Sequence, residues 1–220
     1  MKRIVPRIAM LVVLSAGVAR AQMTQPARAD TVARVGYTVA DVRFMQGMIG
    51  HHGQALVMTA LVPARTTRPE MRLLAERIEQ SQRAEIAQMS RWLQRRGERV
   101  PEVQQGHDMA RMDSSHATMG GMAGMAMPHA SADTMPMMPG MLTAAQLAAL
   151  AATRGPAFDT LFLADMIRHH EGALTMVASL LVTPSAAQEP EIDRLSSDVD
   201  ADQRAEIARM RALLATLAAR

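Results

Sequence analysis

Phe44-Met45-Gln46-Gly47-Met48-Ile49-Gly50-His51-His52 sets the architecture of this chain, because a near copy follows later as Phe162-Leu163-Ala164-Asp165-Met166-Ile167-Arg168-His169-His170. In each copy a methionine stands three and four residues ahead of a histidine pair, a spacing that places these side chains on one face of a helix. Imidazole and thioether groups are both metal ligands, and the thioether favours soft ions such as Cu(I). The repeat predicts a helical protein in which two related segments share a buried metal site.

The surroundings of each copy predict a helical hairpin. Thr38-x-x-Asp41 resembles a capping box, so a helix is expected over 39–62, ending at Pro63, with a second helix over 69–97. The later copy predicts helices over 158–182 and 190–219. Aromatic residues are only 2% of the chain, which also favours helices over strands. The hairpins, residues 38–97 and 157–220, are expected to pack as one all-α four-helix bundle.

Between the hairpins the composition changes. Residues 107–141 hold ten of the 21 methionines together with Gly, Pro and Ser residues. Such a segment lacks the aliphatic and aromatic surface needed for a core, so residues 98–142 are predicted to be a flexible Met/His-rich linker. A short helix over 143–154, capped by Thr143 and Gln146, is expected to follow.

The first residues resemble an export signal. Basic residues precede a short apolar run, and Ala19-Arg20-Ala21 fits the small-x-small cleavage rule. We expect residues 1–21 to be a signal peptide, residues 22–37 to be a flexible mature N-terminus, and the protein to be periplasmic or otherwise exported. The apolar run is too short to span a membrane, and an uncleaved signal anchor is the alternative.

Charge and cysteine content exclude several classes of function. Four of the 24 Lys and Arg residues lie in the expected signal, which leaves the rest nearly balanced against 21 Asp and Glu residues. No basic field remains to attract nucleic acid. The chain has no cysteine, so it has no disulfide and no thiolate ligand.

The candidate metal ligands fall into three groups. The repeated motifs supply the principal candidates, and Leu163 stands where the first copy has a methionine. Whether the first or second histidine of each pair faces inward stays open, because neighbouring residues point about 100° apart on a helix. The principal candidates are Met45, Met48, His51, His52, Met166, His169 and His170; the inner faces of the partner helices add Glu85, Met89, Glu206 and Met210, and the linker adds Met119, Met122, Met125, Met127 and His129.

Glu85 and Glu206 occupy matching places in the run Gln-Arg-Ala-Glu-Ile-Ala, which occurs in both hairpins. Each is expected to lie among apolar residues, where an unpaired carboxylate is costly. One interpretation is that they bind a cation or orient a ligand histidine. The other is that they point to the bundle edge and pair with arginine.

A carboxylate di-iron bundle would need Glu-x-x-His motifs, and here methionine replaces the glutamate of each motif.

These motifs, with Gln82-x-x-Glu85-Ile86-x-x-Met89 and Met138-Pro139-Gly140-Met141 in the same order, resemble the bacterial domain-of-unknown-function family three hundred and five. The resemblance covers about residues 38–217 and implies an exported, ferritin-like four-helix protein. Some members of that family are periplasmic copper-binding proteins that use Met and His ligands. For this chain the resemblance implies the same seven Met and His residues as ligand candidates.

The leading prediction is an exported protein that sequesters or transfers Cu(I) without catalytic turnover, with other copper-handling envelope proteins as partners. A ferritin-like oxidase using Fe, Mn or Cu is one alternative. A metal-free interaction bundle in the cell envelope is another. The sequence leaves the metal, its oxidation state, the stoichiometry and the oligomeric state open.

Overall fold

A computed structural model of the chain describes residues 36–103 and 138–219, which form helices and the loops between them. The expected signal peptide, most of the expected N-terminal segment and the middle of the Met-rich linker lie outside these residues. The helices are α1 (Val39–Arg65), α2 (Pro69–Arg95), α4 (Ala144–Ala152), α5 (Gly155–Leu181) and α6 (Pro190–Ala218).

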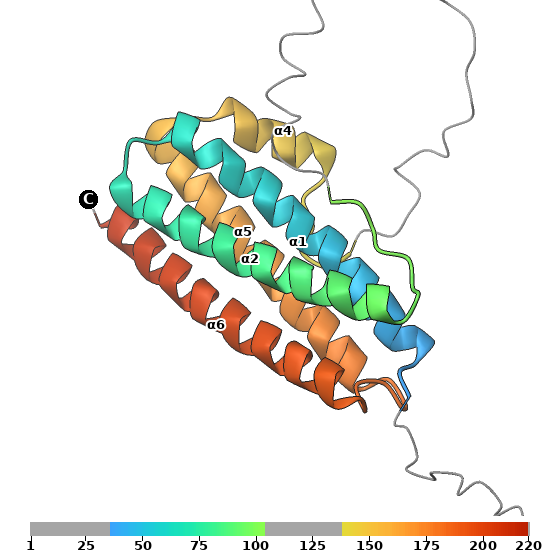
Figure 1. The fold of residues 1–220 in the computed structure, drawn as a ribbon. Coiled ribbons are helices and arrows are strands. Elements are labelled where there is room, and N and C mark those ends of the chain that lie inside the picture. The colour runs from blue at the N-terminus through green and yellow to red at the C-terminus, as the bar shows by residue number, and fades with distance from the viewer. Residues whose placement is uncertain (1–35, 104–137, 220) are drawn as a thin grey trace, which may run out of the picture. The chain divides into compact units, whose positions relative to one another are not determined.

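The four long helices form two antiparallel hairpins, α1/α2 and α5/α6, that pack side by side (Figure 1). α1 contacts α5, and α2 contacts α6, while the short α4 contacts both α1 and α5. The all-α class and the two hairpins predicted from the repeat are confirmed. None of the described helices combines the length and the apolar character needed to cross a membrane.

Local sequence explains where the helices begin. Thr38 and Asp41 form the predicted capping box of α1, with the Asp41 amide donating to Thr38 Oγ1 at 3.2 Å. Thr143 and Gln146 form the corresponding box of α4. α2 and α6 both start at a proline, whose missing N–H costs nothing in the first turn of a helix.

Two helix bounds differ from the sequence prediction. α1 does not end at Pro63 but continues to Arg65. Proline removes one amide donor, and the following turn still closes, since the Thr66 amide donates to the Val62 carbonyl at 3.2 Å. α5 begins three residues early, at Gly155, because Pro156 fits the first helical turn.

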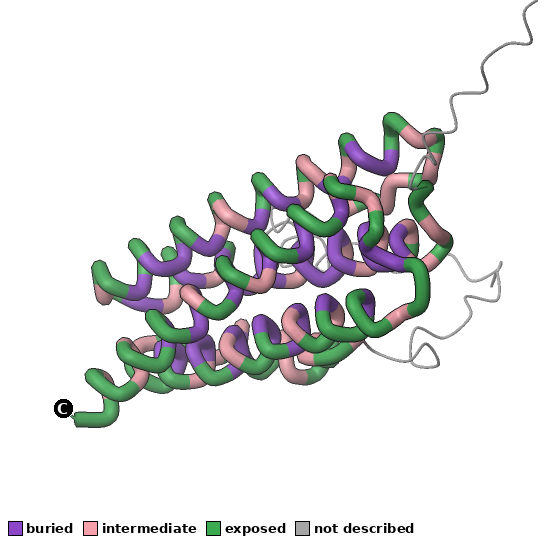
Figure 2. Tube along the Cα trace, turned by 90° about the horizontal axis from the view of Figure 1, so that it is seen from below, coloured by how far each residue is buried: buried purple, intermediate pink, exposed green. Residues whose placement is uncertain are grey.

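Each of the four long helices turns one face inward, where the buried residues line up along the axis (Figure 2). The apolar core has two clusters. One contains Met48, Trp92, Val177 and Val199, and the other contains Met58, Ile78, Phe162 and Met210. Along every long helix the two clusters are separated by polar residues. This polar layer crosses the middle of the bundle and consists of His51, His52, Gln82, Glu85, His169, His170, Gln203 and Glu206, each at most 6% exposed.

Contacts near both ends of the bundle hold the hairpins together. At one end Asp41 Oδ1, at the start of α1, accepts from the Ala187 amide in the α5–α6 loop at 2.8 Å. At the other end Arg68 Nε lies 3.0 Å from Asp159 Oδ2 on α5. These links and the two apolar clusters fix the alignment of α1 against α5, which brings the two histidine motifs together.

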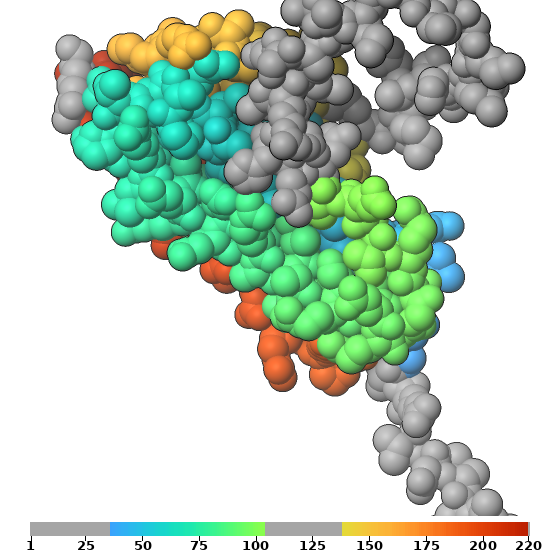
Figure 3. Space-filling model, turned by 45° about the horizontal axis from the view of Figure 1, so that its top comes forward, coloured from blue at the N-terminus to red at the C-terminus, as the bar shows by residue number. Residues whose placement is uncertain are grey.

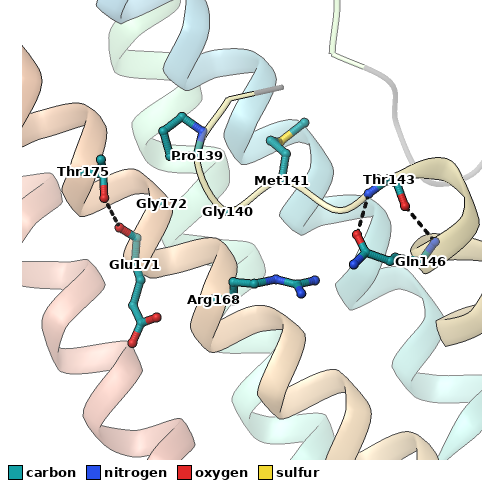
Figure 4. Close-up of a pocket in the computed structure, with 9 residues that line it drawn as sticks. All are labelled: Pro139, Gly140, Met141, Thr143, Gln146, Arg168, Glu171, Gly172 and Thr175. Carbon is teal, nitrogen blue, oxygen red and sulfur yellow. Dashed lines mark hydrogen bonds between the residues drawn. The ribbon is translucent and has the colours of Figure 1, made fainter. Parts of the chain in front are cut away.

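Both described ends of the predicted linker pack on the bundle. After α2, residues 98–103 turn back over α1 (Figure 3). There the Gln46 side chain donates to the Arg99 carbonyl at 2.7 Å. Residues 138–142, which we call the strap, cross α5 beside Gly172 before α4 begins (Figure 4). The prediction of a flexible segment up to residue 142 therefore does not describe the strap, which makes specific backbone contacts.

Gln54 holds the strap at its far end. Its side-chain amide donates to the Leu142 carbonyl at 2.9 Å, and its side-chain oxygen accepts from the Leu142 amide at 2.7 Å. In the middle of the strap Gly140 has φ +76° and lies directly on the backbone of α5, where a Cβ would come within 2.5 Å of the Arg168 carbonyl oxygen. Only glycine fits this position.

Candidate metal centre

All four histidines of the repeated motifs face the interior. His51, His52 and His170 are fully buried, and His169 is 1% exposed. The sequence left open which histidine of each pair points inward, and in the structure both do. The first histidine of each motif faces the other hairpin, and the second faces its own partner helix.

His51 and His169 meet at the centre of the polar layer. Their ring centroids are 3.9 Å apart, with 36° between the ring planes. Within each motif the two rings are farther apart, at 6.3 Å for His51 and His52 and 6.1 Å for His169 and His170. The closest imidazole pair of the layer therefore joins the two halves of the molecule.

Each second histidine is bonded to a glutamate. His52 Nε2 donates to Glu85, and His170 Nε2 donates to Glu206 Oε2 at 2.6 Å. These contacts correspond to the interpretation in which the glutamates orient histidines, rather than to pairing with arginine at the bundle edge. A carboxylate that accepts the ring N–H holds the imidazole in place and leaves the other nitrogen, Nδ1, as the electron-pair donor.

The strap makes the equivalent contact to His51. The Pro139 carbonyl lies 3.0 Å from His51 Nε2. A carbonyl oxygen can only accept a hydrogen bond, so this contact places the proton on Nε2 and the free lone pair on Nδ1. Among the described side chains, Nδ1 of His51, His52 and His170 and Nε2 of His169 are buried without a hydrogen-bond partner.

Burial keeps the central pair neutral. It lowers the pKa of His51 from the ordinary 6.5 to about 3, with the neighbouring His52 acting in the same direction and the Pro139 carbonyl opposing it. Burial, together with the charges of His51, His170 and His52, also holds the pKa of His169 well below its ordinary value. Neutral imidazole is the form that can ligate a metal.

The predicted methionines lie on both sides of the polar layer. Met45, Met48 and Met89 belong to one apolar cluster and are fully buried. Met166 and Met210 are fully buried in the other cluster, where Leu163 takes the place that corresponds to Met45. The thioethers therefore flank the layer unequally, with three predicted candidates on one side and two on the other.

The remaining predictions fare differently. The predicted ligands in the linker all lie outside the described residues: Met119, Met122, Met125, Met127 and His129. Sequence reasoning missed Gln82 and Gln203, each 1% exposed, which begin the repeated run that contains the layer's glutamates. Their matching places in the two hairpins were the available signal. In the described ranges no three His, Asp or Glu side chains are gathered so as to hold a metal by themselves.

A groove of about 450 Å³ between α2 and α6 connects the layer's carboxylates with the surface. Its charged lining consists of four carboxylates and two arginines: Glu85, Glu206, Asp198, Asp202, Arg77 and Arg209. Burial, followed by the charges of Glu85, Glu206 and Asp198, raises the pKa of Asp202. The two glutamates that contact buried histidines thus also border an opening in which carboxylates outnumber arginines.

Solved structures resemble this chain over most of its length. A fragment of a DUF305 protein from Deinococcus radiodurans is 30% identical with a TM-score of 0.61, over 82% of this chain and 98% of that one. A DUF305 protein of proposed secreted location from Streptomyces coelicolor is 27% identical with a TM-score of 0.60, over 81% and 94%.

CopM in its Cu(II)-bound form is 26% identical with a TM-score of 0.55, over 80% of this chain and 96% of that one. Other structures of CopM are of its Cu(I)-bound and Ag-bound forms. No curated protein sequence matches the chain. The family model described as "Domain of unknown function (DUF305)" matches residues 41–214, and the chain belongs to this family.

Proposed function

We propose that this protein is an exported carrier or store for Cu(I), which it holds through histidine and methionine side chains and does not turn over catalytically. The observation that carries this proposal is the convergence of the two histidine motifs, with the His51 and His169 rings 3.9 Å apart in the middle of the bundle. The likeness to CopM, which has been solved with copper and silver, supports the same class of ion.

The histidines are prepared for ligation by their surroundings. Glu85 and Glu206 hold the rings of His52 and His170 and increase the basicity of the free nitrogens, as carboxylates do behind metal-bound histidines. Four imidazole nitrogens in the layer lack a hydrogen-bond partner, and a buried polar atom in that condition is costly unless something satisfies it. A bound metal ion would satisfy these atoms.

The neighbouring thioethers select a soft ion. Met48 stands one helical turn before His51 and His52 on α1, and Met166 stands one turn before His169 and His170 on α5. Thioether sulfur prefers Cu(I) and similar ions to hard, oxygen-seeking cations. Because Met45 is matched by Leu163, we expect the first half of the molecule to contribute the stronger site.

A ferritin-like metal oxidase is the second candidate that the sequence raised. Di-iron bundles ligate their metals directly through glutamates. Here the layer's two glutamates are bonded to histidines, and methionine occupies the glutamate place of each motif. These contacts favour binding and transfer over oxygen chemistry.

The proposed setting is the bacterial envelope, where the protein would exchange Cu(I) with other copper-handling proteins. The export signal expected at residues 1–21 supports this location. The groove bordered by Glu85 and Glu206 supports access, because its four carboxylates outnumber its two arginines and these two glutamates contact the buried histidines. If the protein were instead a metal-free interaction bundle, it would not bind Cu(I) through these histidines.

An anaerobic competition titration with a chromophoric Cu(I) chelator tests the proposal. We expect the variant with His51, His52, His169 and His170 changed to alanine to bind Cu(I) at least 100-fold more weakly at the bundle site, as loss of all imidazole ligands requires. A matched control replaces two buried methionines outside the predicted set, Met58→Leu and Met71→Leu, and should retain the wild-type affinity.

Four buried substitutions can unfold the protein, so the single variants His169→Gln and His52→Gln are measured as well, with circular dichroism as the check on folding. A folded quadruple variant with wild-type affinity would overturn the proposal. Oxygen uptake by the copper-loaded protein distinguishes storage from oxidation, and sustained uptake would favour the oxidase.

A further inference from the structure

A second place where thioethers converge lies outside the polar layer, where the strap meets α1. We propose that Met138 and Met176 form a separate, surface-accessible site for a soft monovalent cation, Cu(I) or Ag(I), next to the buried histidines. The class of ion rests on the proposed function, whereas the site itself rests on contacts that the polar layer does not share.

The strap fixes the position of Met138. Its next residue, Pro139, is bonded to His51 through its carbonyl, and the far end of the strap is held by two hydrogen bonds with Gln54. The strap is also pressed onto α5, since a Cβ on Gly172 would come within 2.0 Å of the Pro139 oxygen. Met138 therefore projects from an anchored backbone.

Met138 and Met176 approach the same point of α1, although they come from different parts of the chain. A Cβ placed on Gly47 would lie 3.5 Å from Met138 Sδ and 3.4 Å from Met176 Cε. Gly50 lies about one turn further along α1 and is approached by Met138 alone, whose Cε would be 3.7 Å from a Cβ placed there. Because Gly47 has no side chain, the ends of both methionine side chains can approach α1 at this point.

The exposure of this pair differs from that of the methionines in the core. Met138 and Met176 are half-buried, whereas Met45, Met48 and Met166 are completely inaccessible. Two neutral thioethers can bind Cu(I) or Ag(I) without releasing a proton, so the site would work at any ordinary pH. Partial exposure allows exchange with a solution donor.

The location suggests how an ion would proceed inward. Met138 directly precedes Pro139, whose carbonyl contacts His51, so the same short segment of chain carries the site and touches the polar layer. An ion held by the pair could pass to the histidine lone pairs by ligand exchange. No bond other than the metal–ligand bonds changes, and the ion keeps its oxidation state.

The alternative is that both methionines merely fill space over a glycine, which methionine does well. Leucine separates the two explanations, because it fills a similar volume without a sulfur lone pair and usually costs less than about 1.5 kcal/mol. The test uses the full mature chain carrying ¹³C-methyl methionine, with Ag(I) as the probe because it is diamagnetic and is not reoxidised.

We expect Ag(I) to shift the methyl signals of Met138 and Met176 together, with the signals assigned from the single Met→Leu variants. The double variant Met138→Leu/Met176→Leu should bind one Ag(I) fewer than wild type, while the control Met58→Leu/Met71→Leu keeps the wild-type stoichiometry. Thermal unfolding checks that both double variants fold equally well.

The outcomes separate this site from the polar layer. If the two methyl signals do not move and the double variant keeps the full stoichiometry, the thioether pair is not a site, whatever the histidines do. If the quadruple histidine variant loses its buried ion but keeps the methyl shifts, both proposals are supported. If the histidine variant loses nothing while the double variant loses one ion, this site stands and the buried histidine site fails.

Discussion

Replacing Gly172 with alanine should detach the strap from the bundle, although the same change favours the helix itself. Gly172 lies inside α5, where alanine is better than glycine by about 1 kcal/mol. The new Cβ would, however, come within 2.0 Å of the Pro139 oxygen, 2.5 Å of its carbonyl carbon and 2.8 Å of Gly140 Cα. These are backbone atoms, so no side-chain rotation can relieve the overlap.

The size of the effect follows from the bonds that depend on the strap. Moving it away breaks the contact of Pro139 with His51 and strains the two hydrogen bonds of Gln54 with Leu142. At about 0.5–1.5 kcal/mol for each bond, the loss is about 1.5–4.5 kcal/mol. After the helix gain is subtracted, Gly172→Ala should be less stable than wild type by about 0.5–3.5 kcal/mol.

Gly50→Ala is the matched control, because Gly50 also lies inside a long helix and also faces the strap. Its Cβ would meet only the flexible Met138 Cε, at 3.7 Å, which is ordinary contact. Urea unfolding followed by circular dichroism should show Gly50→Ala about 1 kcal/mol more stable than wild type. If Gly172→Ala is stabilised as much as Gly50→Ala, the strap is not seated as described.

The other predictions concern the histidines and the hydrogen bonds between Gln54 and the strap. Glu85→Gln should weaken Cu(I) binding about 10–100-fold in the chelator competition and change the free energy of unfolding little. A neutral amide still accepts the ring N–H of His52 but no longer raises the basicity of the imidazole. Equal affinities of the variant and the wild type would contradict this role. The pKa values of His51 and His169 are lowered in the folded state, so the free energy of unfolding should be highest above pH 6.5. It should decrease as the pH falls below 6.5, down to about pH 3 for His51, because the unfolded chain binds protons that the buried rings do not. Urea unfolding of the metal-free protein at pH 7.5 and pH 5.0 measures this loss, and identical stabilities would show that the rings are hydrated. Gln54→Leu should speed hydrogen exchange at the Leu142 amide by at least 10-fold, as measured by mass spectrometry, since that amide loses its acceptor. Unchanged protection would mean that the strap is held without the hydrogen bonds of Gln54.

The helices and the histidine layer could be predicted because their signals are local and repeated. The capping box at Thr38 and the proline at the start of α2 specify helix starts through neighbouring residues alone. The duplicated Met-x-x-His-His motif places imidazoles from both halves at the same depth, once two antiparallel hairpins are assumed. The confirmed fold and the buried histidines both follow from these short-range patterns.

The strap could not be predicted, because nothing in its own sequence holds it. Met138-Pro139-Gly140-Met141 has the composition of a linker, and its position depends on partners far along the chain. Gln54 reads as a polar residue on the outer face of α1, and Gly172 reads as a weakness in α5, until the two are found to hold the same segment. Contacts of that kind appear only when the tertiary structure is known.

The pairing of Glu85 with His52 was one of two interpretations that the sequence left open. Period and spacing place Glu85 on the inner face of α2, but they do not say which neighbour it meets. The choice between histidine and arginine depends on the rotation of α2 about its own axis against α1. The large apolar side chains around Trp92 and Ile78 set that rotation, and their packing is a property of the assembled core.

The layer of histidines, glutamates and glutamines between two apolar clusters also determines how the halves of the chain recognise each other. Sliding α5 along α1 by one turn, about 5.4 Å, would set His51 opposite Met166 or Ala173 and leave ionisable groups facing hydrocarbon. Two related hairpins could otherwise pair in several registers, since both have a long apolar stripe. The polar layer thus fixes the register of the two hairpins, because its side chains are costly to bury without one another.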